Sequence, residues 1–328
     1  MAIKFFDMFA GIGGFRSGLE AIGGFECVGY CEIDKYAKQA YEAMYDTGGE
    51  LYFDDARKIV PEQLPDFDLL VGGFPCQSFS IAGARKGFDD TRGTLFFEIA
   101  RIAAVKKPKY LFLENVPGLL NHDKGRTFET ILRTLDGLGY NVCWQVLNIK
   151  NFGLLIKAKT KDGYQVAYPG DSIDIAFSGQ NSRRGRVGNQ VAHTLTTSAT
   201  QAYYFIDLNP DPKLTEIARC ITARHDSGIS NHKAEHSGVF VENSVVLDDD
   251  EKFAVAFVEL NGEIHIGRIR KLTPRECWKL QGFTDDQFDK AKATGLSDSR
   301  LYKMAGNAVT VNVIAEIGKI IKIVNDKN

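Results

Sequence analysis

The first 150 residues alternate short apolar runs with helical patterns, and this alternation constrains the fold more than any other feature. Strand-like runs separated by amphipathic stretches are typical of βα units, whose strands lie parallel in one sheet. We expect strands over residues 4–9, 26–32, 69–73, 110–113 and 141–149, and helices over residues 14–22, 34–41, 95–102 and 128–138. The sequence therefore predicts an α/β fold with a doubly wound, mostly parallel sheet.

The character of the chain changes after Gly153. Residues 154–268 are rich in Gly, Ser, Thr and Asn and carry short β-type runs, which predict a smaller β-and-loop domain. Helical patterns return over residues 274–280 and 311–324. We expect a first domain of residues 1–153, a second of residues 154–268, and a C-terminal segment, residues 269–328, that packs back on the first.

Charge and cysteine content exclude several classes of protein. The 328 residues carry a formal net charge of −2, which argues against a uniformly basic nucleic-acid binder but allows a local basic face. No apolar run is long enough to span a membrane, and the N terminus does not resemble a signal peptide. The six cysteines form no CxxC pair, and the spacing of His225, His232 and His236 fits no ordinary zinc site. We expect a cytoplasmic protein without a metal.

A cysteine follows the third predicted strand at a position that suggests chemistry. The strand stops in Gly72-Gly73-Phe74-Pro75, so Cys76 lies on a loop at a strand's carboxyl end, where open α/β sheets bind ligands. Buried cysteines often only pack. A cysteine after proline on an exposed loop is better explained as a nucleophile.

A glycine-rich turn, Phe9-Ala10-Gly11-Ile12-Gly13-Gly14, joins the first predicted strand to the first helix. Glycines let a backbone approach a ligand closely and open the helix N terminus towards it. The second strand ends in Glu32, where an acidic residue can hydrogen-bond a ribose. The spacing departs from the full dinucleotide fingerprint, which argues against a hydride-transfer enzyme. The glycine-rich turn and Glu32 together indicate a site for a nucleoside cofactor.

A second carboxylate lies at the end of another strand, in Leu113-Glu114-Asn115-Val116. Carboxylates are also common in turns and helix caps. Yet Glu114 and Cys76 both follow parallel strands, so they are expected at the same edge of the sheet. A thiolate beside a carboxyl that can hold a proton is a workable catalytic pair.

Five motifs then occur in order along the chain: residues 7–15, 73–77, 114–116, 270–277 and 306–309. Together they resemble the ordered motifs of the DNA methyltransferases that modify carbon 5 of cytosine. The resemblance implies the S-adenosylmethionine-dependent methyltransferase fold, with S-adenosylmethionine as the methyl donor and double-stranded DNA as the substrate. It makes residues 1–153 the catalytic and cofactor-binding domain and residues 154–268 the target-recognition domain.

The resemblance also assigns roles to residues. It implies that Cys76 adds to carbon 6 of a flipped cytosine while Glu114 holds the ring nitrogen. It implies that Glu32 binds the ribose and Asp55 the adenine amino group, and Ile33 stands where the family often has an aromatic residue. The full expected cofactor set is Phe9, Ile12, Gly14, Glu32, Ile33, Asp55, Pro75, Leu95 and Asn307.

The expected DNA contacts come from two regions. The glycine-rich, basic loop of residues 80–93 reads either as a solvated loop or, by the resemblance, as a lid that closes over DNA. The Gln-x-Arg-x-Arg motif that the family has after Asn-Phe-Gly is missing after Gly153. Either the run of residues 180–186 supplies these arginines from a later position, or the segment is lost. The expected DNA-binding residues are Gln77, Ser80, Arg92, Arg183, Arg184, Arg186 and Thr196.

Two other functions stay open at this point. The chain could be a catalytically impaired relative that acts as a DNA-binding module, or an RNA cytosine methyltransferase; the large β-rich insert favours duplex DNA over RNA. We expect a monomer with no membrane partner. A cognate restriction endonuclease would be a partner in function and not in a complex.

Overall fold

The computed structural model describes residues 2–74, 95–147 and 271–327 in full, and between residues 154 and 270 only the backbone of strands. The chain divides into two compact units. The first contains residues 1–148 and 308–328, and the second contains residues 149–307. The domain boundaries expected at residues 153 and 268 stay predictions. Among the described residues, no helix is both long and apolar enough to cross a membrane.

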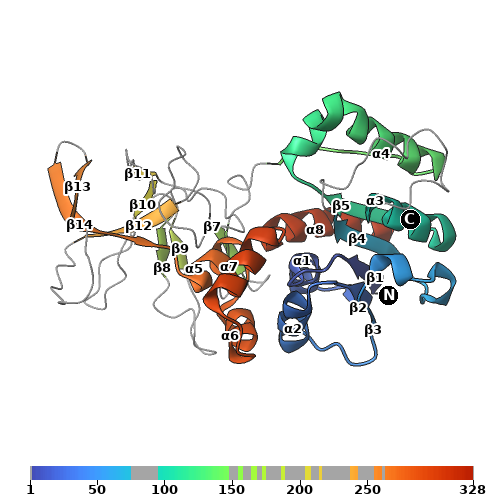
Figure 1. Cartoon of the computed structure of the whole chain (residues 1–328), viewed down its shortest axis with the longest axis horizontal. Helices are drawn as coiled ribbons and strands as arrows, with labels where there is room; N and C mark the ends of the chain where they lie inside the picture. Colours follow the sequence, from blue (N-terminus) through green and yellow to red (C-terminus); the bar gives the residue numbers. More distant parts are fainter. Residues whose placement is uncertain are drawn as a thin grey trace. The chain divides into compact units, whose positions relative to one another are not determined.

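A five-stranded parallel sheet forms the centre of the first unit, in the order β3-β2-β1-β4-β5 (Figure 1). Its strands are β1 (Ile3–Met8), β2 (Phe25–Cys31), β3 (Leu51–Phe53), β4 (Leu69–Gly73) and β5 (Tyr110–Glu114). The strand order steps outward from β1 to both sides, as a doubly wound sheet requires. The predicted fold class is confirmed.

Helices cover both faces of this sheet because successive strand residues point to opposite sides. Phe5 and Val71 pack on one face with residues of α1 and α8, while Phe6 and Leu70 pack on the other with residues of α3 and α4. The helices are α1 (Gly14–Ile22), α2 (Lys35–Met44), α3 (Leu95–Lys106), α4 (Arg126–Gly137) and α8 (Val311–Lys327). The short 3-10 helices η1 (Ala56–Lys58), η2 (Pro61–Gln63) and η6 (Pro117–Gly125) lie in the connections.

Close packing of α8 against α1 brings the C-terminal helix onto the parallel sheet. A side chain at Gly18 of α1 would place its Cβ 2.6 Å from Cβ of Ile314, and one at Gly318 would come within 2.8 Å of Ile22. Contacts this short are not tolerated, so the absence of side chains at these positions permits the approach. Lys322 adds a hydrogen bond of 3.2 Å from Nζ to the carbonyl of Gly23.

One predicted strand is wrong. Residues 141–147 form no strand, and residues 148 and 149 lie outside the described part of the chain. The alternating apolar residues that suggested it, Val142, Trp144 and Val146, are exposed, and the Trp144 ring packs on Phe128 at 5.2 Å. In the described residues the sheet ends at β5, so this segment has no strand beside it to complete the ladder.

The described part of the second unit consists of antiparallel strands and three helices. One sheet has the order β11-β10-β12-β14-β13, and two hairpins pair β6 with β7 and β8 with β9. The strands are β6 (Leu154–Lys157), β7 (Tyr164–Ala167), β8 (Ser172–Asp174), β9 (Arg186–Gly188), β10 (Tyr204–Asp207), β11 (Leu214–Thr215), β12 (Ser237–Glu242), β13 (Val255–Leu260) and β14 (Glu263–Lys271).

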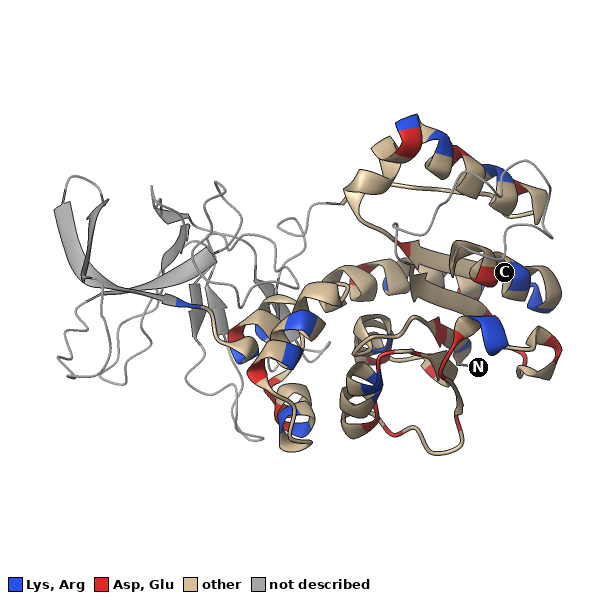
Figure 2. Cartoon of the chain, in the orientation of Figure 1, with Lys and Arg blue, Asp and Glu red and all other residues tan. Residues whose placement is uncertain are grey.

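The helices of the second unit enclose a small aromatic core. They are α5 (Pro274–Leu280), α6 (Asp285–Ala293) and α7 (Asp298–Asn307). Trp278 is fully buried, packs on Phe283 and Phe288, and donates a 2.9 Å hydrogen bond to the carbonyl of Leu301. Basic and acidic side chains are interspersed along these helices (Figure 2), and pairs such as Lys279–Asp285 are 2.9 Å apart.

Candidate functional site

The carboxyl ends of the parallel strands lie at one edge of the sheet, and most of the described site residues follow them. The glycine-rich turn follows β1, Glu32 follows β2, and β4 and β5 end at Gly73 and Glu114 (Figure 1). Because the strands are parallel, their loops open on the same side of the sheet. The sequence therefore brings the two halves of the expected site to a common edge.

The turn after β1 exposes its backbone to the open space at this edge. Phe9, Gly11 and Gly13 have φ of 56°, 56° and 77°, so the chain reverses within a few residues. A Cβ at Gly11 would meet no atom within 4 Å, whereas a Cβ at Gly14 would lie 2.5 Å from the carbonyl oxygen of Val309. Gly11 thus leaves room for a ligand, while Gly14 is required by the packing behind the turn.

Glu32 is fixed in position by backbone amides on both sides. Its Oε2 accepts a 2.7 Å hydrogen bond from the amide of Gly11, and its Oε1 accepts one of 2.7 Å from the amide of Asp34. Only 8% of the residue is exposed, and burial raises the pKa of its carboxyl while these two amides oppose the rise. Each oxygen keeps a lone pair that can accept a further hydrogen bond.

The apolar residues of the expected cofactor set that the structure describes differ in their surroundings. Ile33 is 72% exposed. Ile12 is 1% exposed, so its side chain packs inward and only its backbone can border a ligand. Phe9 is half-buried against the core between the sheet and α3, and Leu95 is the half-buried first residue of α3.

The carboxylate of Asp55 is hydrogen-bonded to the side chain of Arg57. Asp55 caps η1, and its carboxylate accepts hydrogen bonds from Nε of Arg57 at 2.9 Å and Nη2 of Arg57 at 2.7 Å. Those hydrogen bonds lower the pKa of Asp55 to about 2, so it is ionised at neutral pH. Asn307, the last residue of α7, is exposed in the second unit.

Glu114 lies beside the strand that leads to Cys76. It pairs with Gly73 in the register of β4 and β5, and a Cβ at Gly73 would come within 2.9 Å of Oε2 of Glu114. Burial raises the pKa of the Glu114 carboxyl. The neighbouring Asn115 donates a 2.6 Å hydrogen bond from Nδ2 to the carbonyl of Phe74. The loop that carries Cys76 therefore starts next to a half-buried acid.

Several expected site residues lie outside the described residues. They are Pro75, Cys76, Gln77, Ser80, Arg92, Arg183, Arg184 and Thr196, together with the predicted lid and the histidines at 225, 232 and 236. Arg186 is the first residue of β9 and pairs with Asp174 of β8, but its side chain is not described. Among the described residues, no group of three His, Cys, Asp or Glu side chains is placed to hold a metal ion.

A buried polar cluster under the glycine-rich turn was missed by the sequence analysis. Asp7 is completely buried, and burial raises its pKa to about 7. Its Oδ2 accepts a 3.3 Å hydrogen bond from the hydroxyl of Tyr41, while Oδ1 has no partner within the described residues. Arg16 binds Glu50 at 2.8 Å and packs over the Tyr45 ring at 4.6 Å. The helical spacing of Tyr41 and Tyr45 was the only sequence signal.

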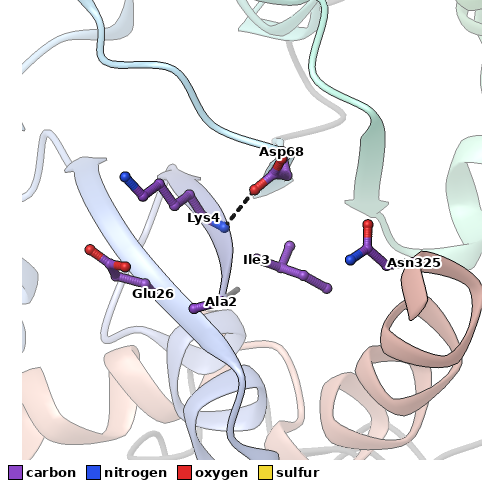
Figure 3. A pocket seen from close by; sticks show the side chains of 6 residues that line it. All are labelled: Ala2, Ile3, Lys4, Glu26, Asp68 and Asn325. Atoms are coloured by element: carbon purple, nitrogen blue, oxygen red, sulfur yellow. Dashed lines mark hydrogen bonds between the residues drawn. The ribbon is translucent and has the colours of Figure 1, made fainter. Parts of the chain in front are cut away.

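One pocket lies at the other end of the sheet. It is lined by the amino ends of the strands and by α8, with Lys4, Glu26, Asp68 and Asn325 at its rim (Figure 3). The backbone amide of Lys4 donates a 2.9 Å hydrogen bond to Asp68. Open α/β sheets bind ligands at the carboxyl ends of their strands, so this pocket is separate from the candidate site.

Comparisons with known proteins agree with this geometry. A protein-family model described as C-5 cytosine-specific DNA methylase matches residues 3–155 and 176–323. The type II methyltransferase M.HhaI of Haemophilus parahaemolyticus is 35% identical over 317 residues, which are 96% of this chain and 93% of that protein. The orphan methyltransferase M.SPRI of Bacillus phage SPR is 31% identical over 425 residues, covering 97% of each chain.

A solved structure supports the fold. The S. pombe Dnmt2 methyltransferase aligns with a TM-score of 0.59 over 98% of this chain and 99% of that one, at 15% identity. An identity this low carries the fold alone, and it confirms the methyltransferase architecture expected from the sequence. The family match covers most of the chain and includes both strand-end loops of the candidate site. The chain therefore belongs to the C-5 cytosine-specific DNA methylase family and is a DNA cytosine-5 methyltransferase.

Proposed function

We propose that the protein transfers a methyl group from S-adenosylmethionine to carbon 5 of a cytosine flipped out of double-stranded DNA, with Cys76 as the nucleophile. The observation that carries the proposal is the partly buried carboxyl of Glu114 at the end of β5. It lies beside Gly73, three residues before Cys76, and burial raises its pKa. A carboxyl whose pKa is raised holds a proton more readily and can donate it to a ring nitrogen of cytosine.

The residues at the carboxyl edge fit the donor. Gly11 leaves open space above the turn, Glu32 presents a buried carboxylate for ribose hydroxyls, and Ile33 offers an exposed apolar surface to a base. Asp55 is ionised and accepts from Arg57, and it could also accept from an adenine amino group. The bound donor would supply an electrophilic methyl group; the chain's own residues bind and orient it.

The chemistry on cytosine follows from the two catalytic residues. Carbon 5 of cytosine is a poor nucleophile, and it is out of reach inside the base stack. The base is therefore first flipped into a pocket, at a cost of a few kcal/mol. The Cys76 thiolate then bonds to carbon 6 while Glu114 protonates the ring nitrogen, and the electron pair of the 5,6 double bond becomes available at carbon 5. Carbon 5 would then take the methyl group, and the electrons of the broken S–C bond would stay on the donor sulfur, which leaves as a neutral thioether. Loss of the carbon 5 proton to water restores the double bond and expels the thiolate, and the ring nitrogen returns its proton to Glu114.

Arginines that can replace those of the missing motif occur later in the chain. The family match stops at residue 155 and resumes at residue 176. Gln180, Arg183, Arg184 and Arg186 lie inside the resumed match, whereas most of the β6–β7 hairpin falls in the gap. This supports an inserted hairpin that displaces the arginines along the sequence, and it argues against their loss. We propose that these arginines contact DNA.

Duplex DNA is favoured over RNA as the substrate. Relatives that align over nearly all of this chain are named type II or orphan methyltransferases, and the family model describes DNA methylases. Both a restriction-linked role and a solitary role occur among those names. We propose a monomeric DNA enzyme whose recognised sequence is set by the second unit.

A covalent trap tests this proposal. The full-length protein is incubated with S-adenosylmethionine and duplex DNA that contains 5-fluorocytosine, whose fluorine cannot leave as the carbon 5 proton does. We expect a complex that survives denaturation, that Cys76→Ala does not form, and that Cys143→Ala, which removes an exposed cysteine, still forms. A protein that binds donor and DNA but never traps across varied sequences would be a DNA-binding module. Trapping on RNA alone would identify an RNA enzyme.

A further inference from the structure

Four tyrosine rings form a continuous row between the two loops of the proposed donor site. Tyr45 packs on Tyr41 at 4.8 Å, Tyr41 stacks on Tyr30 at 4.4 Å, and Tyr30 packs on Tyr52 at 5.2 Å between ring centroids. This tyrosine row starts under the glycine-rich turn and ends beside β2. Aromatic rings in contact hold each other's orientation, so the row gives its terminal hydroxyls fixed positions.

Both ends of the tyrosine row bind the main chain of the donor loops. The Tyr45 hydroxyl lies 2.9 Å from the carbonyl oxygen of Gly13 and 3.2 Å from that of Ile12. At the other end, the Tyr52 hydroxyl donates to the carbonyl of Glu32 at 3.1 Å. Neither tyrosine belongs to the five motifs by which the sequence resembles the family.

The Tyr45 hydroxyl has one proton, and this determines the direction of its hydrogen bonds. Carbonyl oxygens only accept, so the single hydroxyl proton of Tyr45 must point at the turn. The Tyr45 hydroxyl also lies 2.5 Å from the hydroxyl of Ser17, which must then be the donor of that pair. Burial raises the pKa of Tyr45 above its usual value, so the hydroxyl keeps this proton throughout the physiological range.

The Tyr45 ring also defines the space at the turn. A Cβ at Gly13 would lie 2.6 Å from Cε2 and 2.7 Å from the hydroxyl oxygen of Tyr45, and Gly13 has φ of 77°. The ring therefore blocks one side of the peptide while the hydroxyl holds its carbonyl. With the carbonyls of Ile12 and Gly13 held from below, the neighbouring amides keep one orientation at the ligand side.

We infer that Tyr45 is a positioning residue for the methyl donor: its hydroxyl anchors the carbonyls of the glycine-rich turn so that the turn is already shaped to bind S-adenosylmethionine. The inference rests on the proposed donor site. It attributes part of the affinity for the methyl donor to Tyr45, which lies outside the family motifs and acts through the backbone of the turn. Preorganising a loop in its bound conformation raises affinity because less ordering is needed on binding.

Donor binding by Tyr45→Phe tests this role, with Tyr30→Phe as the matched control. Tyr30 is equally buried and belongs to the same row, but its hydroxyl donates to the side chain of Glu42 and not to a donor loop. Calorimetry with S-adenosylhomocysteine on the full-length protein should show binding weakened about five- to tenfold in Tyr45→Phe and within about twofold of wild type in Tyr30→Phe. Hydrogen exchange of the amides of residues 11–14 should accelerate only in Tyr45→Phe.

Steady-state kinetics separate positioning from general damage. In Tyr45→Phe the KM for the donor should rise while kcat at saturating donor stays within about twofold, because the turn contacts the donor and not the cytosine. Unchanged donor affinity in a folded Tyr45→Phe protein would overturn the inference. If wild-type protein binds no S-adenosylhomocysteine, the proposed donor site itself fails, and this result is distinguishable before any variant is made.

A second variant covers the case in which Tyr45→Phe folds poorly. Ser17→Ala combined with Tyr45→Phe removes the Ser17 hydroxyl that has lost this partner, and deleting both members of a buried pair costs less than deleting one. The double variant should recover stability and still bind S-adenosylhomocysteine about five- to tenfold more weakly than wild type. The Tyr45 hydroxyl is still missing from the turn, and the Gly13 carbonyl keeps its 2.8 Å hydrogen bond from the amide of Ser17. Wild-type affinity in the double variant would refute the role of the hydroxyl.

Discussion

Two carboxyls lie at the same edge of the sheet in different chemical settings: Glu32 is buried and Glu114 is half-buried. Glu32 receives hydrogen bonds from the amides of Gly11 and Asp34, which favour its ionised form. For Glu114, burial is the one cause among the described residues that shifts the pKa of the carboxyl, and none of those residues donates a hydrogen bond to it. Burial raises the pKa of both carboxyls, but only Glu32 has amides that oppose the rise, and this difference suits them to different roles.

The comparison teaches how one sheet edge can serve two substrates. The β1–β2 half presents fixed acceptors, which suits a nucleoside donor whose ribose hydroxyls donate hydrogen bonds. The β4–β5 half presents a carboxyl that resists ionisation, which suits protonation of a base.

Replacing the acid should have the largest effect. Glu114→Gln keeps the shape of the side chain but cannot transfer a proton, so kcat should fall by roughly 10²- to 10⁴-fold. Donor affinity should stay unchanged, because Glu114 lies in the β4–β5 half. Single-turnover methylation and calorimetry measure the two quantities, with the exposed Glu129→Gln on α4 as the control. A variant that retains a tenth of wild-type kcat would remove Glu114 from the chemistry.

A third buried carboxyl extends the comparison to stability. The pKa of Asp7 is raised from 3.8 to about 7, mainly by burial, and the charged groups facing it are Arg16, Glu32 and Glu50. The folded protein binds the Asp7 proton more tightly than the unfolded chain does. The contribution of this proton to the free energy of unfolding is therefore present at low pH and is lost as the pH rises through 7. Between pH 5 and pH 8, wild type should lose roughly 2–3 kcal/mol relative to Asp7→Asn.

Urea denaturation of both proteins across this pH range measures the difference directly. Taking the difference from Asp7→Asn cancels the other titrating groups, including Glu32 and Glu50, whose pKa values are also raised by burial. Parallel stability curves would mean that Asp7 is ionised throughout and is compensated by Arg16.

The sequence predicted the sheet and the proposed donor edge because both depend on local patterns. Each βα unit has its own apolar period, and parallel strands necessarily end at one edge, so the contact of Glu32 with Gly11 follows from their positions after β2 and β1. The strand expected over residues 141–149 failed because alternation alone cannot supply a neighbouring strand. In its place Trp144 packs on Phe128.

The buried polar cluster could not be predicted for a different reason. Asp7 is the last residue but one of the apolar strand β1 and looks like a polar residue leaving the core. Its complete burial arises only when Tyr41 of α2 packs over the strand. Likewise the tyrosine row joins residues from β2, α2 and β3, which no periodicity relates to each other. Such contacts depend on the tertiary fold.

Weakening the fixed acceptor should have a smaller effect than removing the acid. In Glu32→Gln one carboxylate oxygen becomes an amide nitrogen, which faces a backbone N–H and cannot accept its hydrogen bond. The dissociation constant for S-adenosylhomocysteine should rise about 10- to 100-fold, with a smaller fall in kcat at saturating donor. Glu42→Gln, an exposed change on α2 that leaves the donor loops untouched, is the control. If kcat falls more than donor affinity, the proposed division between the two halves is wrong.

The smallest effect should come from the exposed end of the tyrosine row. Tyr52 is 37% exposed, so water can replace the hydrogen bond that its hydroxyl makes to the carbonyl of Glu32. Tyr52→Phe should therefore weaken donor binding by only about two- to threefold, less than the loss expected for the buried hydroxyl of Tyr45. Calorimetry on both variants under one condition ranks them. An equal or larger loss in Tyr52→Phe would mean that the backbone after β2, and not the glycine-rich turn, limits the shape of the donor site.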